Sequence, residues 1–361
     1  MKQKGGSLYN SPLSPVAPST ELIICLRQLA ALYRAGIPFG RALYIISQQT
    51  QHPTLKIVFT ELVNNINIGW TITNAISIYP GVFPELYVRL IEVGENTGRL
   101  EQMLEKIAFH AEKTREKFMK LFTALAYPVF VIALCLAFLI IGPAFVFRGI
   151  LEFLQDLKTD LPFPTHVLIF SSAMVRSPLF FVIFPILLFG IFMLARSLWK
   201  NRESRRLIQR LILAIPGVGK LYHTSEIATL ARTLAIIFES GILLLPGLEL
   251  TKRVVSIVDL QDAIDMVKKS VTLGDTIYDS FRKSPYFPPV FLQFITAGEQ
   301  TGELGSMMNW AAWICEQNAE HAINVVLEAL QPIIILLIGV IVGFIIIATM
   351  APMLKVAQGL M

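Results

Sequence analysis

A seven-residue motif occurs twice in this chain, and its repetition constrains the fold more than any other feature. Residues 94–100 read GENTGRL, and residues 298–304 read GEQTGEL. The two copies stay in register beyond the motif, where Glu112 of the first copy corresponds to Glu316 of the second. A match that keeps its spacing over this distance indicates a duplicated structural unit. The chain is therefore expected to contain two related domains.

Each copy of the repeat continues to a proline, Pro128 or Pro332, near the start of a long apolar segment. A helix that spans a bilayer needs about 20 apolar residues, and three segments of the chain meet this length. We predict transmembrane helices over residues 124–147, 179–199 and 330–353. The composition agrees, because 54% of the residues are hydrophobic and 16% are charged, which is typical of a membrane protein with sizeable soluble parts.

The remaining sequence shows helical periodicity and no alternation typical of strands. Leu22, Leu26 and Leu29 lie on one face of a helix that ends near Gly36. We predict an all-α, polytopic membrane protein with two homologous cytoplasmic helical bundles and three transmembrane helices. The expected divisions are a disordered tail (1–19), the first bundle (20–123), transmembrane helix 1 (124–147), an external loop (148–178), transmembrane helix 2 (179–199), the second bundle (200–329), transmembrane helix 3 (330–353) and an external tail (354–361).

The basic residues predict how the chain is oriented in the membrane. Lysines and arginines gather before the first apolar segment and after the second, whereas the loop between these segments carries few. Such clusters stay on the cytoplasmic side. The N-terminus and both bundles are therefore predicted to be cytoplasmic, and the C-terminus periplasmic or external. Residues 1–19 lack the apolar run of a signal peptide.

Further positions repeat in the same order, among them Arg27 with Arg232 and Gly36 with Gly241. Each half thus contains an R-x-L-A helix, a G-E-x-x-G-x-L turn and a membrane helix that follows a proline. With these motifs the chain resembles the GspF/PilC family of inner-membrane platform proteins, which serve type II secretion systems and type IV pili. The resemblance extends from about residue 22 to about residue 355.

The resemblance implies a function and a set of partners. A platform protein couples a cytoplasmic hexameric assembly ATPase to the insertion of pilin or pseudopilin subunits into a fibre. It works in the lipid bilayer of the bacterial inner membrane with other assembly proteins, and it is expected to be a homo-oligomer, a dimer or larger. Two alternatives stay open: a small transporter or channel subunit, and a membrane signalling receptor. The scarcity of charges in the apolar segments disfavours the first.

The sequence shows no pattern typical of catalysis. Residues 215–221 read IPGVGKL and resemble a phosphate-binding loop, but Ala214 and Leu221 stand where that motif needs Gly and Ser or Thr. The histidines have no metal-binding spacing, and the cysteines form no C-x-x-C pair. No segment has the basic and aromatic pattern of a nucleic-acid groove. We therefore predict no enzymatic activity, no cofactor, no metal site and no nucleic-acid partner.

The repeated residues are the candidates for functional positions, with two interpretations each. In a tight turn between helices, the glycines provide positive φ or close helix approach, and Glu95 caps a flanking helix. Alternatively, Glu95 and Glu299 contact a partner or a second subunit. The charged Arg27 and Arg232 lie in apolar helix faces, and each needs either a carboxylate of its own domain or contact with the ATPase. The complete set is Gly94, Glu95, Gly98, Gly298, Glu299, Gly302, Arg27, Arg232, Pro128 and Pro332.

Overall fold

The computed structural model describes residues 20–145, 163–177, 185–186, 189–190, 192–194, 196–199 and 201–359. The described part of the chain is helical and contains no strand, which confirms the predicted fold class. Contacts divide the chain into two compact units, and each is described separately below. The first unit combines the residues up to Leu121 with Lys220–Glu320, and it holds most of both predicted bundles. The second unit combines Phe122–Gly219 with the residues from His321 onward.

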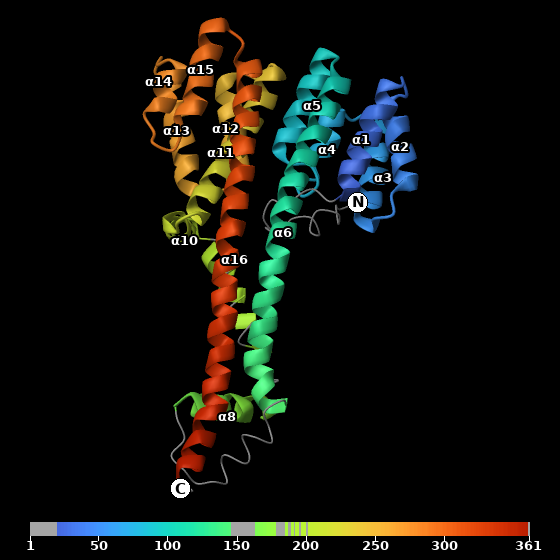
Figure 1. The fold of residues 1–361 in the computed structure, drawn as a ribbon. Helices are drawn as coiled ribbons and strands as arrows, with labels where there is room; N and C mark the ends of the chain where they lie inside the picture. Colours follow the sequence, from blue (N-terminus) through green and yellow to red (C-terminus); the bar gives the residue numbers. More distant parts are fainter. Residues whose placement is uncertain are drawn as a thin grey trace. The chain divides into compact units, whose positions relative to one another are not determined.

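The first bundle contains five short helices and the beginning of a long one (Figure 1). They are α1 (Thr20–Arg34), α2 (Phe39–Gln49), α3 (Pro53–Asn67), α4 (Ile72–Ser77), α5 (Glu85–Thr97) and α6 (Leu100–Phe145). Gly36 and Gly69 end α1 and α3 with φ of +82° and +95°, a region that L side chains rarely adopt. The helix α4 starts at an N-cap, where the Thr71 hydroxyl accepts from Asn74 N–H at 3.2 Å.

The second bundle repeats these elements in the same order. They are α11 (Val218–Glu239), α12 (Leu244–Val254), α13 (Val258–Thr272), α14 (Ile277–Arg282), α15 (Pro289–Thr301) and α16 (Leu304–Gly359). The local chemistry repeats as well, because Gly241 and Gly274 have φ of +75° and +98°. The Thr276 hydroxyl accepts from Asp279 N–H at 3.0 Å at the N-cap of α14. The chain therefore contains two homologous helical bundles, as the repeated motif predicts.

The last helix of each bundle continues without interruption into an apolar stretch. The helix α6 has 46 residues and α16 has 56 residues, and Pro128 and Pro332 lie inside these helices rather than at their beginnings. Among the described residues, these two helices are long and apolar enough to cross a membrane. Within the described residues, the predicted transmembrane helices 124–147 and 330–353 are thus parts of longer helices that begin at Leu100 and Leu304.

The second unit contains one helix that the sequence analysis missed. Residues 148–178 are predicted to be a loop, yet Phe163–Arg176 forms the helix α8. The Thr165 hydroxyl donates to the Ala348 carbonyl of α16 at 2.7 Å, and both residues are buried. A further helix, α10 (Arg202–Ala214), precedes α11. Of the predicted transmembrane helix over residues 179–199, residues 179–184, 187–188, 191 and 195 lie outside the described residues, and the described remainder is helical.

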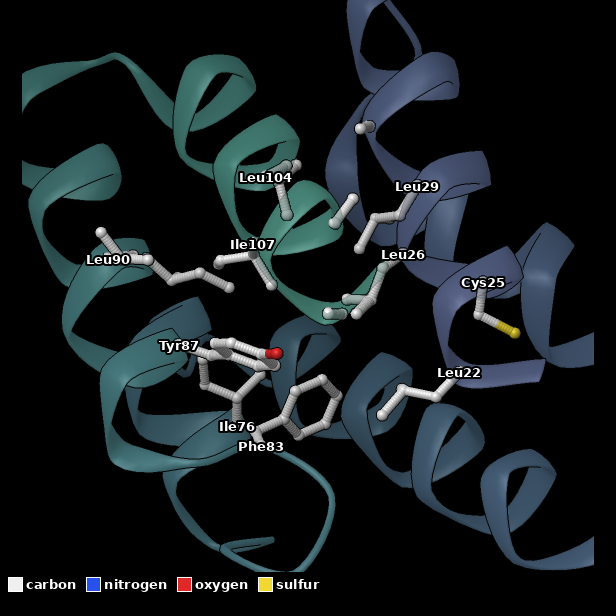
Figure 2. Close-up of a cluster of buried hydrophobic side chains, with 14 of the residues drawn as sticks. Leu22, Cys25, Leu26, Leu29, Ile76, Phe83, Tyr87, Leu90, Leu104 and Ile107 are labelled. Carbon is white, nitrogen blue, oxygen red and sulfur yellow. The ribbon is translucent and has the colours of Figure 1, made fainter. Parts of the chain in front are cut away.

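The core of the first bundle is formed by side chains from helices that are far apart in the sequence. Figure 2 shows Leu26 and Leu29 of α1 directed toward Leu104 and Ile107 of α6, with Tyr87 of α5 among them. Leu104 and Ile107 are completely buried. Burying a side chain of this size stabilises the fold by roughly 1.5–3 kcal/mol, so α1 and α6 are held together mainly by apolar contact.

One polar pair lies inside this core. The Tyr87 hydroxyl and His110 Nδ1 are 3.2 Å apart, and both side chains are buried. Burial raises the pKa of Tyr87, and burial together with the nearby Arg232 guanidinium lowers the pKa of His110 to about 4. The histidine is therefore neutral in the folded protein at neutral pH, where it can hydrogen-bond with the tyrosine without an unpaired buried charge.

We predict that His110 makes the protein less stable in acid. Unfolded His110 binds a proton below pH 6.5, whereas the folded form binds it only near pH 4, so stability is lost as the pH falls between these values. The loss attributable to this group is on the order of 3 kcal/mol. The free energy of unfolding of the detergent-solubilised chain, measured from pH 7 to pH 4, should fall less steeply in His110→Gln. Parallel profiles for the wild type and His110→Gln would contradict the assignment, and His52→Gln at an exposed histidine is the control.

Candidate functional site

The two copies of the motif lie where the fifth helix of each bundle meets the long helix. The first four residues of each copy still belong to α5 or α15, and the second glycine and the residue after it lie between the two helices. Gly98 and Gly302 are the left-handed C-caps, with φ of +70° and +74°. The motif therefore places its sharp turn at the second glycine and leaves the first glycine in the helix.

Gly94 and Gly298 allow the helices on both sides of the turn to approach closely. A Cβ atom added to Gly94 would lie 2.9 Å from Leu100 Cα and 2.9 Å from Met103 Cγ. At Gly298 it would lie 3.0 Å from Leu304 Cα. Because backbone atoms cannot move aside, a side chain at either position would push the long helix away from its neighbour.

The glutamate of the motif holds the beginning of a different helix. Glu95 Oε1 accepts from Ile72 N–H at 2.9 Å, and Oε2 accepts from Thr73 N–H at 3.1 Å and from the Thr73 hydroxyl at 2.7 Å. In the second bundle, Glu299 accepts from Ile277 N–H at 2.8 Å and from Tyr278 N–H at 3.1 Å. A carboxylate at a helix N-terminus satisfies N–H groups that have no partner in the helix, and it matches the positive end of the helix dipole.

The repeated arginines pair with carboxylates of their own bundles. Arg27 pairs with Glu112 on α6. Arg232 binds Glu316 on α16 through two bonds of 2.8 Å, and it donates to Asn309 at 2.8 Å. The glutamates that keep the repeat in register are thus the partners of the repeated arginines. Contact between these arginines and an ATPase stays a prediction.

The ten candidate residues do not form one site. The motif residues surround the α5–α6 and α15–α16 turns, the arginines join the first helix of each bundle to its last, and the prolines lie further along the long helices. What they share is the long helix, because the motif residues lie where it begins, the arginines pair with glutamates on it and the prolines lie within it. Pro128 and Pro332 lack the N–H that would bond the carbonyls of Ala124 and Glu328.

Several structural residues escaped the sequence analysis. The Tyr87–His110 pair and the N–H groups at Ile72 and Ile277 carry no recognisable motif. The partners of Arg27 and Arg232 could have been found from the sequence. Glu112 and Glu316 occupy equivalent positions of the repeat, as the two arginines do, which is what an ion pair present in both bundles requires.

Residues 215–221 form a turn, at residues 215–217, and the beginning of the helix that follows it. The helix α10 ends at Ala214, Gly217 has φ of +80°, and α11 begins at Val218. Lys220 and Leu221 therefore lie in the first turns of a helix. Among the described residues, no group of three or more His, Cys, Asp or Glu side chains is placed to hold a metal ion.

Comparison with known proteins matches both halves of the chain. The family model for type II secretion system protein F matches residues 25–147 and again residues 230–352. A type IV pilus assembly protein PilC of Thermus thermophilus is 30% identical over 345 residues, covering 93% of this chain and 82% of that protein. PilC of Pseudomonas aeruginosa is 27% identical, covering 99% and 95%. Type II secretion system protein F of Vibrio cholerae is 27% identical, covering 93% and 82%.

The fold and the repeated motifs define an all-helical membrane protein with two homologous bundles, each extended by an apolar helix. The matches to both halves show which family has this organisation. The chain belongs to the type II secretion system protein F family, in agreement with the resemblance to GspF/PilC proteins found in the sequence.

We predict that Gly94→Ala destabilises the protein, whereas Gly40→Ala does not. The new Cβ at Gly94 meets backbone at 2.9 Å, while at the helical Gly40 the nearest atom is 3.7 Å away. Overpacking costs about 1–3 kcal/mol, and replacing a helical glycine by alanine gains up to about 1 kcal/mol. Urea unfolding of the solubilised chain, followed by circular dichroism, should rank Gly94→Ala below the wild type and Gly40→Ala level with it or above. Equal stability of the two variants would contradict the close packing.

We also predict that Glu95→Gln and Glu299→Gln loosen the helices α4 and α14. Each variant loses the negative charge and one acceptor oxygen at a helix N-terminus, which costs about 1–2 kcal/mol. Hydrogen exchange of the amides at residues 72–76 and 277–281 should become at least tenfold faster. Glu303→Gln, at the exposed second glutamate of the same motif copy, is the matched control and should leave these amides unchanged.

Proposed function

We propose that this protein is the inner-membrane platform of a type IV pilus or type II secretion assembly machine. In this role it couples a cytoplasmic hexameric ATPase to the insertion of pilin or pseudopilin subunits into a fibre, together with other inner-membrane assembly proteins. The names of the relatives support an assembly role. The protein itself performs no chemistry, and its contribution is mechanical.

The continuity of the long helices is the observation that carries this proposal. The helix α6 begins at the motif turn in the bundle, passes Glu112, the partner of Arg27, and continues as the apolar stretch after residue 121. The helix α16 repeats this arrangement with Glu316 and Arg232. A displacement of the bundle therefore reaches the apolar stretch through one continuous helix, without a loop in between.

Exposed apolar side chains offer the ATPase a repeated docking point. Ile68 is 72% exposed and Leu273, its counterpart in the repeat, is 86% exposed. Each lies directly before the helix whose N-terminus is held by the motif glutamate, so each lies at the end of its bundle where the long helix begins. Exposed apolar residues that recur at equivalent positions fit a partner that contacts both bundles.

The orientation proposed from the basic residues fits this role. Both bundles lie in the cytoplasm with the N-terminus, and the C-terminus lies on the periplasmic side. The pilin or pseudopilin meets the apolar parts of α6 and α16 within the bilayer. A homo-oligomer, a dimer or larger, provides a symmetric base for the fibre.

We predict that Ile68→Asp combined with Leu273→Asp uncouples the ATPase. A carboxylate at both positions removes the apolar contact but leaves the bundles folded, because both side chains are exposed. Co-purification of the assembly ATPase with the full-length protein should fall at least tenfold, and fibres or secreted substrate should be lost. Ile57→Asp, at another exposed isoleucine of the first bundle, is the matched control. Normal ATPase binding and fibre assembly in the double variant would contradict the docking point.

A further inference from the structure

Within the first unit, the two bundles contact each other through different faces. The contributing face of the first bundle, called the α6 face, consists of Lys106, Phe109 and Lys117. It packs on the α11 face of the second bundle, which consists of Thr229, Arg232, Ile236 and Glu239. Lys106 Nζ lies 3.4 Å from Glu239 Oε2, and the Arg232 guanidinium lies 5.6 Å from the centre of the Phe109 ring.

Further contacts show that this interface is tightly made. Lys117 Nζ donates to the Ser225 carbonyl at 2.8 Å and to the Thr229 hydroxyl at 2.7 Å. Ile236 and Ile237 are buried in the same apolar cluster as the core of the first bundle. The interface therefore combines apolar burial, an ion pair and a cation over an aromatic ring.

The repeat provides a second version of each face. In the register that aligns Arg27 with Arg232, the counterpart of the α11 face is the α1 face, which consists of Ile24, Arg27, Ala31 and Arg34. In the register that aligns Leu100 with Leu304, Lys106 and Phe109 correspond to Trp310 and Trp313, which form the α16 face.

Both of these second faces are exposed in the part of the chain that the structure describes. The side chain of Arg232 is 13% exposed, whereas that of Arg27, which makes the equivalent pair with glutamate, is 48% exposed. Trp310 and Trp313 are 57% and 52% exposed, and their rings form a T-shaped pair. If the two bundles were related by a twofold axis, the α16 face would cover the α1 face within one molecule. Both faces are exposed, so the contact between the bundles is head-to-tail. It leaves the α1 face of the first bundle and the α16 face of the second bundle without a partner bundle.

We infer that the α16 face of one molecule binds the α1 face of a second copy of this chain. In this arrangement, which deepens the homo-oligomer proposed above, Arg27 lies against Trp313 as Arg232 lies against Phe109. Arg34 lies against Trp310 of the other copy, in the position that Glu239 takes against Lys106 within one molecule. Both residues of this contact differ between the two versions. Lys106 with Glu239 forms the contact within the chain, and Trp310 with Arg34 forms the contact between copies. A guanidinium over an indole ring is the strongest of the common cation–aromatic pairs.

The residues around Arg34 and Glu239 within their own bundles differ in the same way. Arg34 pairs with Glu101 at 3.2 Å and with Glu105, while Glu239 accepts from Asn309, the counterpart of Glu105. The carboxylates on α6 thus hold the Arg34 guanidinium on the outer surface of α1. Two copies joined in this way give a closed ring in which first and second bundles alternate.

Disulfide crosslinking in membranes tests the contact without requiring the ATPase. Two differently tagged copies of the full-length chain are expressed together, one with Arg34→Cys and the other with Trp310→Cys. Oxidation should yield a product that carries both tags, at least tenfold above the product from Ile57→Cys with Trp310→Cys. Equal yields from the two pairs would overturn the proposal. Such a result would not affect the platform function, because that proposal is tested separately by ATPase binding and fibre assembly.

A charge exchange tests the pairing itself. Arg34→Glu and Trp310→Lys should each weaken self-association of the solubilised protein at least tenfold, measured as a dissociation constant by sedimentation. The two substitutions together rebuild the lysine–glutamate pair of Lys106 and Glu239, and should restore most of the affinity. Additive weakening in the double variant would overturn the proposal. So would loss of ATPase binding in Trp310→Lys with self-association intact, because the α16 face would then belong to the ATPase.

Discussion

The hydrogen bonds from a motif glutamate to the start of a neighbouring helix determine how each bundle is built. Glu95 and Glu299 bind N–H groups at the N-termini of α4 and α14, which are only six residues long and cannot be stable alone. The same glutamate lies one residue after the glycine that brings the long helix into close contact. The carboxylate and the glycine thus join three helices at one point. The long helix starts from this point, so its direction depends on both residues.

The end of the first helix could be predicted near Gly36 because its cause is local. Glycines with positive φ and threonine N-caps of the same kind end and begin further helices in both bundles. The partner of Glu95 could not be predicted in this way, because every helix N-terminus offers the same N–H groups whatever its sequence. The different roles of Gly94 and Gly98 were also hidden. Both fit a tight turn, and only the packing of Leu100 and Met103 shows that Gly94 is needed for contact rather than for conformation.

The repeat also separates residues that stabilise a bundle from residues that face outward. One contact inside the bundles keeps its residue types, in the Arg27–Glu112 and Arg232–Glu316 pairs. Outward positions differ in type, since Lys106 corresponds to Trp310 and Arg34 to Glu239. The internal pairs need the same chemistry in both copies because the bundle is the same. The outer positions meet different neighbours, so they are free to diverge. The pair that joins the first helix of each bundle to its last is therefore kept in both copies, whereas the positions at the contact between the bundles have diverged.

The position of the prolines adds a mechanical property to the long helices. An uninterrupted helix transmits a shift along its axis, but a proline in its interior removes one backbone hydrogen bond and allows a bend there. Pro128 and Pro332 lie after the glutamates that bind Arg27 and Arg232 and within the beginning of the apolar stretch. The part of each long helix before the proline is fixed to its bundle by the ion pair and the motif turn. The part beyond it has neither of these attachments. In the platform role proposed above, a displacement of the bundle would pass to the apolar part as an axial shift, and a bend at the proline would adjust its direction without unfolding the helix.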